Sequence, residues 1–214
     1  SETEKLEIGG SLRYNYKDND AVSIGQVENF LPSGNSSFAN SNSSNRNKNK
    51  NLIGDFRMEW NPNLMTTFLL KGNLTWGESN GVSSSKSATF NSDPYAVVAD
   101  PNLYLDFASD SNEKLDAIRV NASNNGSLSE GNSLSGNVEM QLTRGLSDNG
   151  RNITFRGTGS YGDNESDRYM HNLTRYYGDN IPTFEENAIR RYITTPTNKY
   201  NVGAEVSYSE PIAD

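Results

Sequence analysis

Alternating residues in the segment 52–76, LIGDFRMEWNPNLMTTFLLKGNLTW, restrict the folds open to this chain. Apolar and polar residues take turns on both sides of Asn61, Pro62 and Asn63. Successive side chains of a strand point to opposite faces, so the pattern predicts two antiparallel strands with one apolar and one polar face. Asn and Pro favour turn dihedrals, and Pro cannot donate to a central ladder, which places the turn between the strands. The apolar face then requires either a protein core or lipid.

Further segments of the chain alternate in the same way. We therefore predict about six strands, at roughly 6–16, 52–60, 65–76, 134–144, 151–161 and 200–208. The residues between some of them lack this period: 17–51, 77–133 and 162–199 are predicted to be long polar connections. The other two connections are short, and the second carries an Asn149–Gly150 turn signal. Long and short connections therefore alternate along the chain.

The overall charge argues against nucleic acid as a partner. The 214 residues carry a formal net charge of -8, and the basic residues are scattered, whereas phosphate binding requires basic stripes. The chain has no cysteine, which excludes a disulfide framework and a thiolate metal site. No run approaches the roughly 18 apolar residues of a membrane-spanning helix. The first residues, SETEKLEIGG, lack the pattern of a signal peptide, and we expect a targeting sequence upstream of them.

Charged residues distinguish the two predicted faces of the strands. Over 6–16, 52–60, 66–76, 134–142, 152–161 and 200–208, the apolar face carries no charged residue. The following nine lie on the other face: Glu7, Arg13, Asp55, Arg57, Glu59, Lys71, Glu139, Arg156 and Glu205. A charged residue that faces lipid at mid-depth costs roughly 2–4 kcal/mol, a penalty sufficient to keep such a face free of charge. We predict that the apolar face meets lipid and that the nine charges face a lumen. There they line a permeation path, contact a plug, pair across strands, or are simply solvated.

Connection lengths and aromatic positions favour a transmembrane β-barrel over a β-sandwich. Outer-membrane barrels have short periplasmic turns and long extracellular loops, whereas sandwich geometry does not lengthen every second connection. Aromatic residues gather at the predicted strand ends, as in interfacial girdles: Tyr14, Tyr16, Trp76, Tyr161 and Tyr200 at one end, Trp60 and Tyr208 at the other. Barrel closure needs about eight strands at least. Residues 1–214 are therefore predicted to be part of one all-β, antiparallel, up-and-down outer-membrane barrel domain, without a complete second domain.

Three segments carry a family resemblance: FRMEWNPNLMTT at 56–67, GRNITFRGTGSYG at 150–162, and RRYITTPTNKYNVGAEVSYSEPI at 190–212. They resemble the β-barrel region of Bacteroidetes outer-membrane proteins related to TonB-dependent receptors. The resemblance implies energised uptake through a large barrel of about 22 strands with a plugged lumen. It also implies an upstream plug domain, the TonB energy-coupling system as a partner, and a surface lipoprotein as a further partner. Neither a plug nor an energy-coupling box is visible in the sequence.

The sequence offers little support for catalysis, metals or cofactors. His171 is the only histidine and no GxSxG elbow accompanies it, so we interpret it as a loop residue. Asp18, Asn19 and Asp20 lack the Gly and distal Glu of a calcium loop, and the glycine-rich run 157–162 lies inside a predicted strand without a following helix. We predict no catalytic residue, no metal ligand and no cofactor.

Aromatic residues of the predicted loops are the candidate ligand contacts: Tyr104, Phe107, Tyr176 and Tyr177. Their rings could stack on a sugar or peptide, or pack within the loops. The predicted function is a non-enzymatic segment of a nutrient receptor or transporter, surrounded by lipid in the bacterial outer membrane. The alternative is a soluble or surface-attached antiparallel β-protein that binds glycans or proteins through its loops. An enzyme is a third class, for which we find no motif.

Overall fold

The computed structural model describes residues 4–30, 36–108, 112–178 and 185–211. Its strands and helices, in chain order, are β1 (Lys5–Phe30), β2 (Ser36–Asn63), β3 (Thr66–Phe90), η1 (Pro94–Ala96), η2 (Pro101–Tyr104), α1 (Glu113–Asp116), β4 (Arg119–Gly145), β5 (Asn152–Tyr176), β6 (Glu185–Thr194) and β7 (Thr197–Ser209). Strands β1 to β5 contain 25 to 28 residues each. At about 3.3 Å per residue, such strands are roughly 85 Å long.

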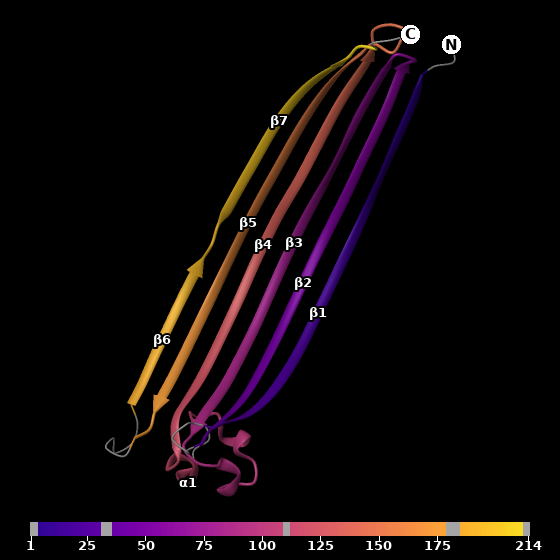
Figure 1. The fold of residues 1–214 in the computed structure, drawn as a ribbon. Coiled ribbons are helices and arrows are strands. Elements are labelled where there is room, and N and C mark those ends of the chain that lie inside the picture. Colours follow the sequence, from indigo (N-terminus) through magenta and orange to yellow (C-terminus); the bar gives the residue numbers. More distant parts are fainter. Residues whose placement is uncertain (1–3, 31–35, 109–111, 179–184, 212–214) are drawn as a thin grey trace.

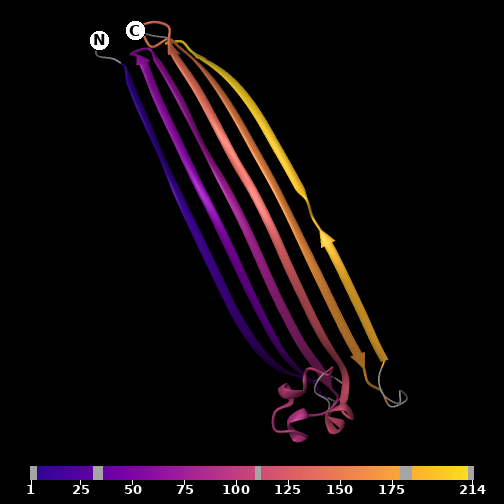
Figure 2. The ribbon, with the colours of Figure 1, turned by 180° about the vertical axis from the view of Figure 1, so that it is seen from behind.

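The strands form one antiparallel, up-and-down sheet in the order β1-β2-β3-β4-β5-β6, with β7 also beside β5. Figures 1 and 2 show a single layer, with both termini near the end that holds the β2–β3 turn. Strand β1 forms one edge of the sheet and β6 with β7 forms the other, and the described residues do not close it. The all-β antiparallel fold is thus confirmed, while closure into a barrel stays a prediction.

Strands β6 and β7 act as one interrupted edge strand. Asp167 lies opposite Thr194 and Asn164 opposite Thr197, so both strands pair with β5 in a single register. Pro196 lies in the gap between them, where it has no N–H to donate. Because the strand is at the edge of the sheet, the missing bond disturbs no further neighbour. This interruption is why the structure has seven strands, against about six predicted.

The prediction of three long polar loops is wrong. To within one residue, each predicted strand lies inside a longer observed strand, and most of 17–51, 77–133 and 162–199 is also strand. In these extensions Asn, Ser and Gly occupy both faces, so the apolar period by which strands are recognised is absent. The connections that the structure describes in full, 64–65, 146–151 and 195–196, are all short, whereas the described residues 91–108 and 112–118 between β3 and β4 make a long excursion.

Polar contacts between neighbouring strands accompany the backbone ladder in the extensions. The hydroxyls of Ser83 and Ser127 are 2.7 Å apart, and those of Ser87 and Ser123 are 2.8 Å apart. Hydroxyl pairs across strands contribute a few tenths to about 1 kcal/mol each. Backbone pairing with such contacts therefore holds these segments in register without a hydrophobic core.

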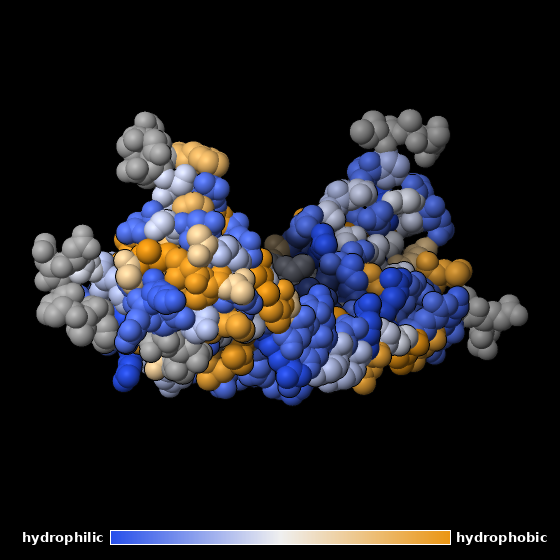
Figure 3. Space-filling view, turned by 90° about the horizontal axis from the view of Figure 1, so that it is seen from below, coloured by the Kyte–Doolittle hydropathy of each residue, from blue (hydrophilic) through white to orange (hydrophobic). Residues whose placement is uncertain are grey.

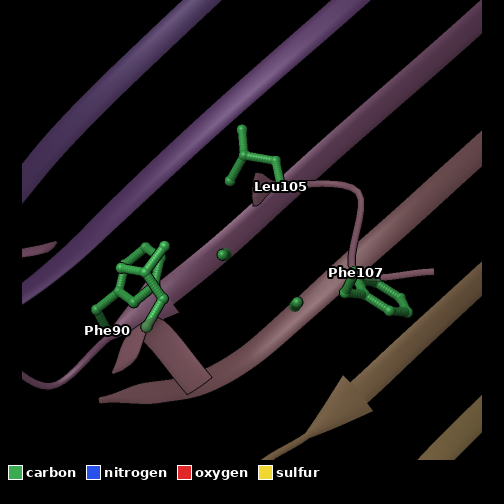
Figure 4. Packing of buried hydrophobic residues seen from close by; sticks show 6 residues of the cluster. Phe90, Leu105 and Phe107 are labelled. Atoms are coloured by element: carbon green, nitrogen blue, oxygen red, sulfur yellow. The ribbon is translucent and has the colours of Figure 1, made fainter. Parts of the chain in front are cut away.

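A small hydrophobic cluster lies at the end of the sheet away from the β2–β3 turn. Residues 91–108 and 112–118, which we call the cap, fold against the sheet at that end (Figure 1). Seen from below, the surface at this end shows hydrophobic residues beside hydrophilic ones (Figure 3). Leu105, Phe107 and Leu115 of the cap pack with Phe90 of β3 and Ala122 of β4 (Figure 4). Each of these five side chains is at most 3% exposed. This cluster is the hydrophobic core of the described residues. No described helix is long and apolar enough to cross a membrane.

We expect Leu115→Ala to loosen the cap. Leu115 is 0% exposed, and truncating a buried leucine costs about 2–5 kcal/mol because contacts are lost and a cavity remains. Proteolytic cleavage within residues 91–118 should accelerate accordingly. Leu103→Ala is the matched control, since Leu103 in the same segment is 67% exposed and its truncation should change stability by less than about 0.5 kcal/mol. Equal cleavage rates for the two variants would contradict the assigned core.

Candidate functional site

The strand register separates the side chains of the sheet into two chemically different faces. Residues directly opposite each other in an antiparallel ladder share a face. We call the two sides the Phe56 face and the Arg57 face, after neighbouring residues of β2. Four consecutive rows of the Phe56 face near the β2–β3 turn are entirely apolar, and we call this region the apolar band. Its four rows, each in the order β1, β2, β3, β4, β5, β7, are Leu6, Trp60, Phe68, Leu142, Phe155, Val206; Ile8, Met58, Leu70, Met140, Gly157, Ala204; Gly10, Phe56, Gly72, Val138, Gly159, Val202; and Leu12, Gly54, Leu74, Gly136, Tyr161, Tyr200.

Glycines in the apolar band lie beside large side chains. In one row Phe56 lies between Gly10 and Gly72, and Val138 lies between Gly72 and Gly159. A Cβ at Gly10 or Gly72 would lie 2.8 Å from a carbonyl oxygen of the adjacent strand. Close approach of the strands and room for Phe56 therefore both depend on these glycines.

Aromatic residues mark both edges of the apolar band. Trp60 and the neighbouring Tyr208 row lie toward the β2–β3 turn, and Tyr14 and Trp76 share the row at the opposite edge. Between the edge rows, β3 runs from Thr66 to Trp76, a rise of roughly 33 Å. The predicted aromatic residues thus border the apolar rows along the sheet.

The Arg57 face beside the apolar band holds the nine predicted charges. The register puts all of them on that one face: Glu7, Arg13, Asp55, Arg57, Glu59, Lys71, Glu139, Arg156 and Glu205. Glu139 accepts from two cations, with Lys71 at 3.2 Å and Arg156 at 3.0 Å. Arg57 also pairs with Glu59 at 2.8 Å. Glu7 pairs with Lys5 at 2.6 Å, so pairing across and along strands, one of the alternatives weighed from the sequence, occurs for six of these nine residues.

Beyond the Trp76 row, the charges change faces. From the Trp76 row, which contains Asp163, toward the cap, the Phe56 face carries Asp18, Asp20, Glu28, Arg46, Lys48, Lys50, Glu78, Lys86, Glu130, Asp163, Glu165, Asp167, Arg175, Glu186 and Arg190. The Arg57 face there consists mainly of Asn, Ser and Gly, as in the row of Asn47, Gly81 and Ser129. The same side of the same strands is therefore apolar over one stretch and charged over the next.

Ion pairs stabilise the charged stretch of the Phe56 face. Arg46 lies 2.8 Å from Asp18 and Lys50 lies 3.1 Å from Glu78. The hydrogen bonds from these cations lower the pKa of Asp18 and the pKa of Glu78. Both carboxylates therefore stay ionised below the pH at which ordinary Asp and Glu side chains protonate, as suits a surface in water.

No described residue covers the apolar band. Leu12 is 76% exposed and Val202 is 82% exposed. At the cap end of the same face the situation is the opposite, because Phe90 is 0% exposed beneath residues 91–118. The chain thus covers apolar side chains of the Phe56 face at one end and leaves a much larger set uncovered at the other.

The four candidate ligand contacts do not form one site. Phe107 is 3% exposed in the cap cluster, with the Arg175 guanidinium 4.6 Å from its ring, so it is a core residue. Tyr104 and Tyr177 pack against the same cluster. Arg119 links them by donating to the Tyr104 carbonyl at 2.9 Å and to the Tyr177 hydroxyl at 3.1 Å. Tyr176 is on the Arg57 face and 45% exposed, and ligand contact stays a prediction for it.

Several residues predicted in loops lie in strands. His171 belongs to β5, opposite Gly126 and Arg190, so its interpretation as a loop residue is wrong. Asp18 belongs to β1 and pairs with Arg46, which explains this acidic residue without a metal. Among the described residues, no group of three or more His, Cys, Asp and Glu side chains could hold a metal ion.

A hollow that the sequence did not indicate lies around Tyr169 and Tyr192. Its volume is about 630 Å³, and its lining includes both tyrosines, Val82, Leu128 and Arg190. Four separate strands supply these residues. The site was missed because its members lie in segments without a hydrophobic period, and only the strand register brings them together.

Comparison with known proteins assigns no family. No family model matches the chain, and no curated protein matches it. Among solved structures, the membrane pore complex of pneumolysin aligns at 10% identity with a TM-score of 0.15, over 94% of this chain and 32% of that chain. The chain thus spans about a third of the length of that protein. A likeness at this TM-score indicates neither a fold nor a function.

We expect adjacent glycines of β1 to respond oppositely to substitution. At Gly10 an added Cβ would lie 2.8 Å from the Asp55 carbonyl oxygen, whereas at Gly9 nothing lies within 4 Å. Gly10→Ala should therefore lower the unfolding midpoint, because β1 must move away from β2. Gly9→Ala should leave the midpoint unchanged or stabilise by up to about 1 kcal/mol, since alanine loses less conformational entropy in a strand. The reverse order in urea unfolding would contradict the packing of the apolar band.

Proposed function

We propose that this chain is a segment of a transmembrane β-barrel whose apolar band faces lipid. The single observation that carries the proposal is the change of chemistry along one face: four apolar rows, then charged rows, on the same strands. The residues on one face of a strand change from apolar to charged where the medium beside that face changes from apolar to aqueous. Lipid beside the apolar band and water beside the charged rows account for both stretches.

The dimensions of the apolar band support this assignment. The two edge rows, Thr66 and Trp76 on β3, are roughly 33 Å apart along the strands. For strands tilted by about 40° this distance becomes about 25 Å, close to the height of the apolar belt of outer-membrane barrels. Tyr and Trp at the band edges fit the interfacial girdles of such proteins. The remaining strand length then projects into water on one side, which gives the long Asn/Ser segments a place outside the membrane.

A soluble sheet accounts less well for the uncovered side chains. Phe90 and its neighbours are sealed by the cap, and a soluble protein would seal Leu12 and Val202 in the same way. Leaving so large an apolar face in water favours aggregation. We therefore rank the soluble glycan- or protein-binding alternative second.

The Arg57 face would then line the lumen, with Lys71, Glu139 and Arg156 as a paired charge cluster inside it. Six strand positions are too few for closure, so further strands complete the proposed barrel.

Following the family resemblance, we propose nutrient uptake coupled to TonB in the outer membrane as its role. Uptake assays with a panel of oligosaccharides, peptides and metal chelates, in cells with and without the gene, test this role. Equal uptake of every solute would contradict it.

We expect Leu70→Arg to abolish membrane assembly of the complete protein that contains this chain. Leu70 is in the apolar band, where an arginine at mid-depth costs roughly 2–4 kcal/mol. Leu69→Arg is the matched control, because Leu69 is the next residue, has the same side chain, and lies on the Arg57 face opposite Glu59. Leu69→Arg should assemble normally, as measured by the urea-resistant membrane fraction.

A second control tests the boundary of the apolar band. Asn80 lies on β3 and on the same face as Leu70, ten residues further toward the cap, between Lys48 and Glu130. Asn80→Arg should assemble normally, because water surrounds that position. If Leu69→Arg or Asn80→Arg loses membrane assembly to the same extent as Leu70→Arg, the lipid assignment of the apolar band is wrong.

A further inference from the structure

The hollow around Tyr169 and Tyr192 combines an apolar floor, an aromatic pair and a cation. The ring centroids of the two tyrosines are 4.6 Å apart, at an interplanar angle of 33°. Val82 and Leu128 lie in the same row of the Phe56 face. Tyr169 is 55% exposed and Tyr192 is 54% exposed. With a volume of about 630 Å³, the hollow is within the usual size of small-molecule sites.

Glycine and histidine shape the next row of this hollow. His171 lies between Gly126 and Arg190 on the Phe56 face. A Cβ at position 126 would lie 3.2 Å from His171 Nδ1, so the glycine leaves room for the imidazole to lie across the strand. The side chains of this row therefore project little from the sheet, and the hollow is open toward Arg190.

Arg190 is the cation that this hollow presents to a ligand. On the same face, Arg46, Lys50 and Lys86 each pair with a carboxylate. Among the described residues, no carboxylate lies within ion-pair distance of Arg190. A guanidinium available beside an aromatic pair fits an anionic ring compound: the ring packs against tyrosine while the phosphate or carboxylate accepts from arginine.

The position of the hollow indicates where such a ligand comes from. It lies on the Phe56 face, six residues beyond the Trp76 edge row on β3, which is roughly 20 Å along the strand or about 15 Å in height after tilt. A phospholipid headgroup layer is only about 6 Å thick. In addition, Asp163, Glu165 and Asp167 lie between the band and the hollow and repel lipid phosphates at lower height. A ligand anchored in the surrounding leaflet reaches Arg190 only through an extended headgroup.

We propose that this hollow binds the anionic oligosaccharide headgroup of a membrane glycolipid, with a sugar ring on Tyr169 and Tyr192 and a phosphate or carboxylate on Arg190. The proposal rests on the lipid assignment of the apolar band, since that assignment sets the height of the hollow above the membrane. The oligosaccharide would lie along the outside of the proposed barrel and not in its lumen.

The test measures binding of a phosphorylated core-bearing lipopolysaccharide to the complete protein in phosphatidylcholine nanodiscs. Arg190→Gln should weaken binding at least about tenfold, because a hydrogen bond to a charged group is lost. Tyr169→Ala should weaken it by about five- to tenfold, since the stacking surface is lost. Arg168→Gln is the matched control: Arg168 precedes Tyr169 on β5 but lies on the Arg57 face, outside the lining of the hollow, so binding should stay within about twofold.

Three outcomes overturn the inference. Equal weakening by Arg190→Gln and Arg168→Gln would show a general charge effect. Binding of phosphatidylglycerol as tight as that of the glycolipid would remove the need for an oligosaccharide. If the free core oligosaccharide bound as tightly as the intact glycolipid, the ligand would be a soluble oligosaccharide and not a membrane glycolipid.

Failure of this inference is distinguishable from failure of the proposed function. If Leu70→Arg and Leu69→Arg assemble equally, the lipid assignment fails whatever the hollow binds. If Leu70→Arg alone fails to assemble while the nanodisc-embedded protein shows none of the expected losses at Arg190 and Tyr169, only the glycolipid site is wrong.

Discussion

The register of the antiparallel ladder is the constraint on which every other feature depends, and in the described strands it shifts only near strand ends, at Trp60–Asn63 and Thr89–Phe90. A shift of one residue between two strands would move an entire set of side chains to the other face. Here the register keeps apolar residues together across β1 to β5 and β7, and it continues unchanged over the break at Pro196. The apolar band, the charge cluster at Glu139 and the hollow at Tyr169 all follow from this single alignment.

The faces of the sheet could be predicted from the sequence because alternation was strong where the surroundings were unlike. In 52–76 one face of each strand is apolar and the other is polar, so apolar and polar residues alternate visibly in the sequence. The nine charges were assigned to one face for this reason, and the register agrees. The same physics explains the failure of the loop prediction: where both faces meet water, as around Asn47, the alternation between apolar and polar residues disappears although the strand continues.

The candidate ligand site was beyond sequence reasoning for a different reason. Tyr104, Phe107 and Tyr177 were chosen as loop aromatics, but aromatic side chains also pack on one another, and here they surround Arg119 or fill the cap. Tyr169 and Tyr192 are separated by 23 positions in the sequence and meet only because β5 and β6 pair. Their contact is a property of the pairing, and no local pattern encodes it.

The cap has a mechanical consequence for so long a sheet. It bonds to Asn40 of β2 through Tyr95 and Asn102, to Lys86 of β3 through Asp106, and to Arg175 of β5 through the Phe107 carbonyl. Its leucines also hold the start of β4. One short segment therefore clips the ends of four strands at the tip farthest from the β2–β3 turn. A ribbon roughly 85 Å long, supported only at one end, would fray and twist at the other, and the clip suppresses the splaying motion there.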